Sequence, residues 1–157
     1  GGGQQNAMRP GTESPALAAA FALALELALE EQKEYADNGH RCQKAFLNAL
    51  QKKTTRFQEN HSKKGLPNTL NLTFSGIDGR MLLPACDAEG LGISAGSACS
   101  SGAPDPSPIL QATGLSKEDS RSSVRISFGR KTKKEDAHEG GRRLGETVLR
   151  LYEIAFQ

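Results

Sequence analysis

The sequence has no tryptophan, and aromatic residues of all kinds make up only 5% of its 157 residues. Hydrophobic residues account for a modest 36%. A chain of this length suits one domain with one core. The scarcity of large aromatic side chains predicts a light core, of the kind that a partner surface completes.

Cysteine is also scarce, and neither sign of charge dominates. The three cysteines, Cys42, Cys86 and Cys99, form no C-x-x-C pair, which argues against a disulfide framework and against a zinc site. We therefore predict that the chain binds no metal and that it is located in the reducing cytoplasm. A net charge of +2, from 20 basic and 18 acidic residues, argues against nucleic acid or an anionic membrane as a partner.

Long hydrophobic runs are limited to one stretch, residues 16–25, which is wholly apolar. The run is too short to span a bilayer. It resembles the apolar part of a secretory signal, but Glu26, Glu30 and Glu31 follow at helical spacing. This pattern favours an alanine-rich buried helix.

Mixed strands and helices are predicted along the rest of the chain. Helical patterns cover residues 15–35, 40–52, 80–89, 108–113 and the chain from 133 on, with a break or kink at 36–39 and a loosening at Gly140 and Gly141. Apolar and polar residues alternate over 70–74 and 123–128, and short strands are predicted at 57–60 and 91–94. The fold class is therefore α+β, with a small, mainly antiparallel sheet flanked by helices.

Residues 94–102 are all small, and Cys99 lies in their middle. Such a run cannot anchor a core, and its glycines widen the choice of backbone conformations. Two interpretations of Cys99 remain equally open on chemistry alone: a reactive thiol presented to a substrate, or a structural loop cysteine.

Two further polar residues each have a plain and a functional interpretation. Gly11 and Thr12 precede a helix start, where they serve either as part of an ordinary N-cap region or as donors to an anion. Arg125 lies on the polar side of its predicted strand, where it is either merely solvated or available to grip a carboxylate through two parallel hydrogen bonds.

Several motifs, in order, resemble a known family. They are Gly1–Gln4, Arg9–Glu13, Leu66–Phe74, the loop around Cys99, Pro106–Ser107 and Ser122–Arg130. Together they look like the C-terminal part of a cysteine desulfurase, a pyridoxal-phosphate (PLP) enzyme of the class V aminotransferase group. The long small-residue loop resembles the branch that serves iron–sulfur cluster assembly and nitrogen fixation. In that family the lysine that holds PLP lies upstream of the Gly-Gly-Gly motif, and this chain begins at that motif.

The resemblance implies a fold like the C-terminal small domain of fold-type I PLP enzymes. It divides residues 1–157, a single C-terminal domain, into an interface and phosphate loop (1–14), a long helical segment (15–52) and an α+β small domain (53–157). The PLP-lysine domain is absent from this chain.

The resemblance also implies an activity and roles for three residues. L-cysteine is converted to L-alanine and a persulfide on Cys99, Arg125 binds the substrate carboxylate, and Thr12 reaches the PLP phosphate of the other subunit of a homodimer. The separation of Arg125 from Cys99 fits the family pattern without an insertion or deletion. The expected partners are the chain's own PLP-binding domain and a sulfur acceptor such as an iron–sulfur scaffold protein. The chain alone is expected to be inactive, and the alternative is a non-catalytic sulfur-relay or interaction module.

Overall fold

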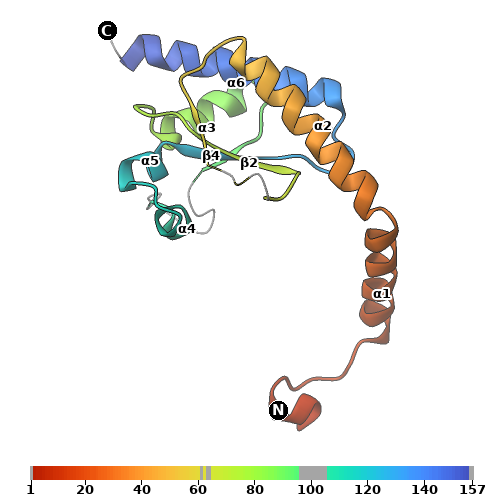
Figure 1. The fold of residues 1–157 in the computed structure, drawn as a ribbon. Coiled ribbons are helices and arrows are strands. Elements are labelled where there is room, and N and C mark those ends of the chain that lie inside the picture. The colour runs from red at the N-terminus through yellow and green to blue at the C-terminus, as the bar shows by residue number, and fades with distance from the viewer. Residues whose placement is uncertain (1, 61, 63–64, 96–105, 156–157) are drawn as a thin grey trace. The chain divides into compact units, whose positions relative to one another are not determined.

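The computed structural model describes residues 2–60, 62, 65–95 and 106–155. These fall into two compact units, residues 1–34 and residues 35–157. Figure 1 shows the elements of both units in chain order. Each unit is described by itself.

The N-terminal unit holds a short 3-10 helix, η1 (Gln4–Ala7), and the helix α1 (Pro15–Glu30). Ser14 caps α1, because its Oγ accepts a hydrogen bond from the backbone N–H of Leu17 at 3.4 Å. Pro15 occupies the first turn, where its missing N–H costs nothing. The predicted helix start at this serine and proline is confirmed.

The apolar side chains of α1 are exposed, although the sequence predicts a buried helix. Phe21 is 73% exposed and Leu17 is 72% exposed. A helix that is apolar on all sides needs cover on all sides, and the N-terminal unit contains too few residues to provide it. The prediction of a buried helix is therefore wrong for the chain as described here. Among the described helices, none combines the length and apolarity needed to cross a membrane.

The second unit begins within α2 (Gln32–Gln51), which runs without a break through residues 36–39. The predicted kink there is wrong, and Gly39 shows why. A Cβ at this position would lie 2.8 Å from the backbone oxygen of Pro67. The glycine thus allows the helix to approach a neighbouring loop closely and does not end the helix. The chain instead turns at Glu31, between α1 and α2.

The described residues of the second unit form a four-stranded sheet. Its strands are β1 (Gln58–Glu59), β2 (Thr69–Thr73), β3 (Ser94–Ala95) and β4 (Ser123–Ser127), in the order β1-β2-β4-β3. Every neighbouring pair is antiparallel. The central pair, β2 and β4, runs from Thr69 opposite Ser127 to Thr73 opposite Ser123. The predicted small antiparallel sheet is confirmed.

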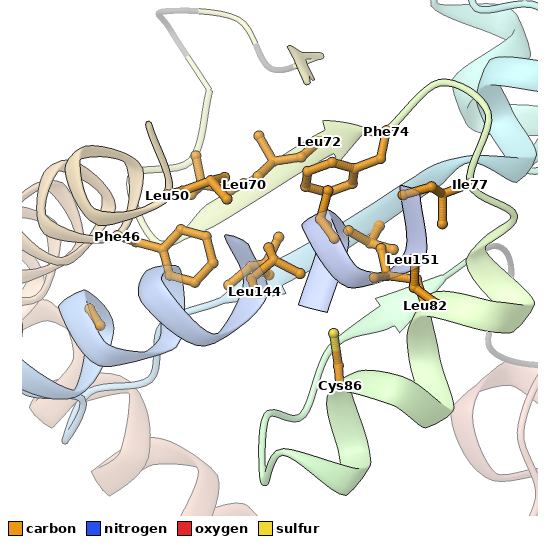
Figure 2. Close-up of a cluster of buried hydrophobic side chains, with 14 of the residues drawn as sticks. Phe46, Leu50, Leu70, Leu72, Phe74, Ile77, Leu82, Cys86, Leu144 and Leu151 are labelled. Carbon is orange, nitrogen blue, oxygen red and sulfur yellow. The ribbon is translucent and has the colours of Figure 1, made fainter. Parts of the chain in front are cut away.

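Helices cover one face of this sheet. They are α2, α3 (Gly79–Ala88) and α6 (Lys134–Ala155), while α4 (Pro108–Ala112) and α5 (Lys117–Arg121) lie between β3 and β4 in the chain. Figure 2 shows apolar side chains of β2 meeting those of all three covering helices. The buried set includes Phe46, Leu50, Leu70, Leu72, Phe74, Leu82, Val124, Ile126, Leu144 and Val148. Alternation along β2 and β4 leaves their polar residues on the opposite face.

One strand lies further along the chain than predicted. The sequence predicts a strand at 91–94, whereas β3 covers Ser94–Ala95. Gly90 has a φ of +68°, and the N–H of Leu91 donates to the carbonyl of Cys86 at 2.9 Å. Residues directly after α3 therefore complete the helix end, and the chain reaches the sheet only at Ser94.

Candidate functional site

Arg125 occupies the middle of β4, on the face of the sheet that the three helices leave uncovered. The residues before and after it in the strand, Val124 and Ile126, are buried, while Arg125 itself is exposed. Its guanidinium makes no hydrogen bond or ion pair to another residue of the described ranges. A cation presented in this way is available to an anionic ligand.

Polar residues flank Arg125 on both neighbouring strands. Asn71 of β2 and Ser94 of β3 are its direct partners in the sheet register. Asn60, just after β1, extends the row, because its N–H donates to the carbonyl of Asn71 at 2.9 Å. One polar row therefore crosses the sheet from Asn60 to Ser94, and the sheet places Arg125 within it.

A second polar row lies beside the first and is buried. The Thr73 and Ser123 side chains are 2% and 1% exposed, and their hydroxyl oxygens lie 2.7 Å apart. The Asn60 side-chain amide joins the two rows, since its Nδ2 donates to Thr73 Oγ1 and to Asn71 Oδ1, both at 2.7 Å. These bonds hold the polar face of the sheet in one arrangement around Arg125.

Cys99 lies outside the described residues, as do its neighbours in 96–105. The strand that leads to it is described. Ser94 and Ala95 pair with Arg125 and Val124, so the chain passes beside Arg125 at Ser94, five positions before Cys99 in the sequence. On the other side of this segment, Ser107 caps α4 through its Oγ, as the sequence predicts.

Thr12 belongs to the N-terminal unit and is exposed. It follows Gly11, whose φ of +128° suits glycine. Thr12 and Arg9 line one open hollow of that unit. The nearby carboxylate of Glu13 accepts a hydrogen bond from Gln5 Nε2 at 2.7 Å. The hollow therefore offers a hydroxyl and a guanidinium to an anion.

The other two cysteines are core residues, as predicted. Cys42 and Cys86 are both fully buried free thiols. Burial raises the pKa of the Cys86 thiol from 9.0 to about 11, and burial also raises the pKa of Cys42. Both are therefore poor nucleophiles at neutral pH. Within the described part of the chain, no cluster of His, Cys, Asp and Glu is placed to hold a metal ion.

Asn60 and Asn71 are site residues that the sequence pattern alone does not predict. The alternation in 70–74 puts Asn71 on the polar side of its strand, and the same reasoning puts Arg125 on the polar side of β4. Which residue of one strand faces which residue of another depends on the sheet register, and the spacing within either strand does not contain that information.

Known proteins resemble this chain over most of its length. The model of the family described as Aminotransferase class-V matches residues 3–139. The chain belongs to the class-V aminotransferase family. A cysteine desulfurase, IscS 1 of Archaeoglobus fulgidus, is 33% identical over 136 residues, which cover 87% of this chain and 36% of that protein. The IscS cysteine desulfurase of Clostridium botulinum is 34% identical over 139 residues, covering 87% of this chain and 35% of that protein.

The relatives also include a mitosomal enzyme and a protein of solved structure. A mitosomal cysteine desulfurase of Encephalitozoon cuniculi is 31% identical over 155 residues, 99% of this chain and 35% of that protein. A NifS-like protein of Rickettsia africae has a similar structure, with a TM-score of 0.75 and 25% identity over 98% of this chain and 39% of that one. This class-V chain thus spans little more than a third of the relatives that it matches, and it shares their fold over that third.

Proposed function

We propose that this chain is the C-terminal part of a cysteine desulfurase, which converts L-cysteine to L-alanine and leaves the sulfur as a persulfide on Cys99. The observation that carries the proposal is the place of Arg125. This cation is exposed on the polar face of the sheet, in register with Ser94, at the start of the segment that contains Cys99. The strand that pairs with the carboxylate binder thus leads, in the sequence, into the segment that carries the thiol.

Arg125 would hold the carboxylate of the substrate. A guanidinium offers two parallel N–H donors to the two oxygens of a carboxylate, which fixes the orientation of the amino acid as well as its position. Arg125 makes no ion pair within the described ranges. No protein carboxylate in those ranges therefore competes with the substrate for its guanidinium, which supports this role.

Cys99 would accept the sulfur. It lies five positions after Ser94 in the sequence, and a chain of that length spans at most about 17 Å, so its thiol stays within reach of a ligand on Arg125. The Cys99 thiolate attacks the sulfur of the bound cysteine, and an S–S bond forms. The carbon–sulfur bond of the substrate breaks, its electron pair goes to carbon, and that carbon takes up a proton to give alanine.

PLP is the cofactor that the family implies, and a hydroxyl and a guanidinium of the N-terminal unit support a place for its phosphate there, beside the carboxylate of Glu13. Thr12 offers an exposed hydroxyl, and Arg9 lines the same hollow with a positive charge. Thr12 would therefore hold the phosphate, in a site shared between the subunits of a homodimer. When bound, PLP supplies an electron sink for the amino acid.

A lysine-bearing domain and a sulfur acceptor, such as an iron–sulfur scaffold protein, complete the proposed system. The exposed apolar side chains of α1 support a domain partner, since a helix that is apolar on all sides is normally covered by protein. The two buried free thiols are consistent with a reducing compartment, for which we propose the cytoplasm.

Adding a lysine-bearing domain tests this proposal. The chain would be mixed with a separately produced lysine-bearing domain of a class-V cysteine desulfurase, PLP and L-cysteine, and alanine would be measured. We expect alanine only when both parts are present, and Cys99→Ala should abolish persulfide formation. The chain without the domain should give no alanine.

A relay function would give a different result. If Cys99 only carries sulfur, the mixture forms no alanine, yet Cys99 becomes a persulfide when the chain is incubated with an active desulfurase from elsewhere. Arg125→Ala separates the two further, because it should lower alanine formation in a desulfurase and leave sulfur transfer to a relay protein unchanged.

A further inference from the structure

Asn71 is the direct partner of Arg125 in the sheet, and its side-chain amide has a defined orientation. In an antiparallel pair, directly opposite residues have Cβ atoms roughly 4.5–5.5 Å apart. Asn71 Oδ1 accepts a hydrogen bond from Asn60 Nδ2 at 2.7 Å. Asn71 Nδ2 makes no hydrogen bond to another residue within the described ranges. Its two N–H groups are therefore available to a ligand.

A buried chain of hydrogen bonds decides which atom of each amide is the donor. The chain ends at the backbone carbonyl of Asp119, which can only accept, so Ser123 Oγ donates to it at 2.6 Å. Ser123 must then accept from the Thr73 hydroxyl, 2.7 Å away. A hydroxyl has a single proton, so Thr73 accepts in turn from Asn60.

The order of donors and acceptors also fixes the bond between Asn60 and Asn71. The atom of Asn60 that meets Thr73 is its donor nitrogen, and the second hydrogen of the same nitrogen bonds the oxygen of Asn71. With its oxygen held toward Asn60 and β1, the Asn71 amide directs its nitrogen away from β1. The neighbouring strand on that side is β4, where Arg125 is the register partner.

We infer that Asn71 Nδ2 and the Arg125 guanidinium together form the seat of the substrate carboxylate. Arg125 contributes the charge, and Asn71 contributes a neutral donor from the adjacent strand. Thr73 and Asn60 are positioning residues, because they orient the amide without touching the ligand. This inference rests on the proposed function for the identity of the substrate, while the seat itself would take any small carboxylate.

Binding of acetate to the ¹⁵N-labelled chain tests the seat directly. Acetate would be titrated at constant ionic strength, with chloride as the control anion, and the side-chain N–H signals would be followed by NMR. We expect the Asn71 amide pair and the Arg125 Nε–H to shift with one common dissociation constant. If the Arg125 signal moves and the Asn71 signals do not, or if neither moves, the inference is wrong.

Variants test the donor and its orientation separately. Asn71→Asp keeps the shape and replaces the donor with a carboxylate beside Arg125, so acetate binding should weaken by more than about tenfold, since hydrogen bonds to charged groups are strong. Thr73→Val breaks the orienting chain and should weaken binding several-fold, whereas Thr73→Ser keeps the hydroxyl and should bind like the wild type. Wild-type affinity in both Asn71→Asp and Asn71→Ala would overturn the inference.

The core signals of Leu72 and Val124, which flank the two site residues, report whether each variant is folded. The titration needs neither PLP nor Cys99, so its result is independent of the proposed activity. Acetate binding at both residues without alanine formation in the reconstituted mixture would defeat the proposed function and leave the seat intact. Alanine formation with no response at Asn71 would do the reverse.

Discussion

Gly141 of α6 lies directly against the backbone carbonyl of Phe46 in α2, so that a Cβ at position 141 would overlap the carbonyl oxygen. The neighbouring Gly140 is different, because a Cβ there would meet only side-chain atoms of Leu91 and Phe46, each at 3.4 Å. The two helices thus cross at one glycine of the pair. This contact brings α2 and α6 close enough to share one core above the sheet.

Gly141→Ala should therefore destabilise the chain, and Gly140→Ala should not. The first change forces α2 and α6 apart against rigid backbone, at a cost of about 1–3 kcal/mol, which is typical of overpacking. The second meets side-chain atoms at a distance close to ordinary van der Waals contact and gains helix propensity of up to about 1 kcal/mol. Urea denaturation of the two variants measures the difference. Equal midpoints would mean that α2 and α6 do not cross at this glycine.

These two glycines also show what the sequence could and could not predict. Periodicity predicts the helices and the alternation of β2 and β4, because a buried side imposes a regular pattern. A glycine in a helical pattern has two meanings, a weakened helix or a close contact, and the sequence alone does not distinguish them. Gly39 and Gly141 both have the second meaning.

Some residues of the candidate site are likewise predictable from the sequence, and others are not. The motif resemblance predicts Arg125, and the alternation along its strand predicts its exposure. Asn71 and Asn60 become visible only through the pairing of β1, β2 and β4, since pairing brings together residues that are far apart in the chain. Cys99 lies outside the described residues, so its place beside Arg125 stays a prediction.

Alkylation should distinguish Cys99 from the other two cysteines. Cys42 and Cys86 are fully buried and their pKa values are raised by burial, so few of their thiols are both accessible and ionised at pH 8. Brief treatment with N-ethylmaleimide followed by peptide mapping should label Cys99 at least about tenfold faster. In urea all three should react alike, and equal labelling in the folded protein would contradict the assignment of Cys99.

Stability should fall in alkaline solution because of Cys86. Its thiol has a pKa of about 11 in the folded chain against 9.0 without burial, so between these values the unfolded chain binds fewer protons than the folded one. The free energy of unfolding therefore decreases as pH rises from about 9 to about 11. Cys86→Ala should remove this part of the decrease. The same slope in both proteins would show that another group, such as Tyr152, whose pKa burial also raises, is responsible.

Arg125 and Thr12 should fail in opposite ways once the lysine-bearing domain is supplied. Arg125→Ala should weaken L-cysteine binding by about 1.5–3 kcal/mol, since it removes a charge-assisted pair of hydrogen bonds, and PLP should stay bound. Arg125→Lys keeps the charge and should recover only part of the affinity. Thr12→Ala should lower PLP retention modestly and leave L-cysteine affinity nearly unchanged. Loss of PLP in Arg125→Ala with normal L-cysteine affinity would contradict this map of the site.

A mixture of two defective chains tests whether Thr12 acts across a dimer. Thr12→Asp places a negative charge where the phosphate is expected and should inactivate a homodimer by repulsion. In the mixture, the Thr12→Asp chain keeps its PLP lysine, and the other chain lacks the PLP lysine and keeps Thr12. If Thr12 serves the partner subunit, the heterodimer combines one intact lysine with one intact Thr12 and regains a single working site. If Thr12 serves its own subunit, both sites stay defective, and confirmed heterodimers without recovered activity would exclude the shared site.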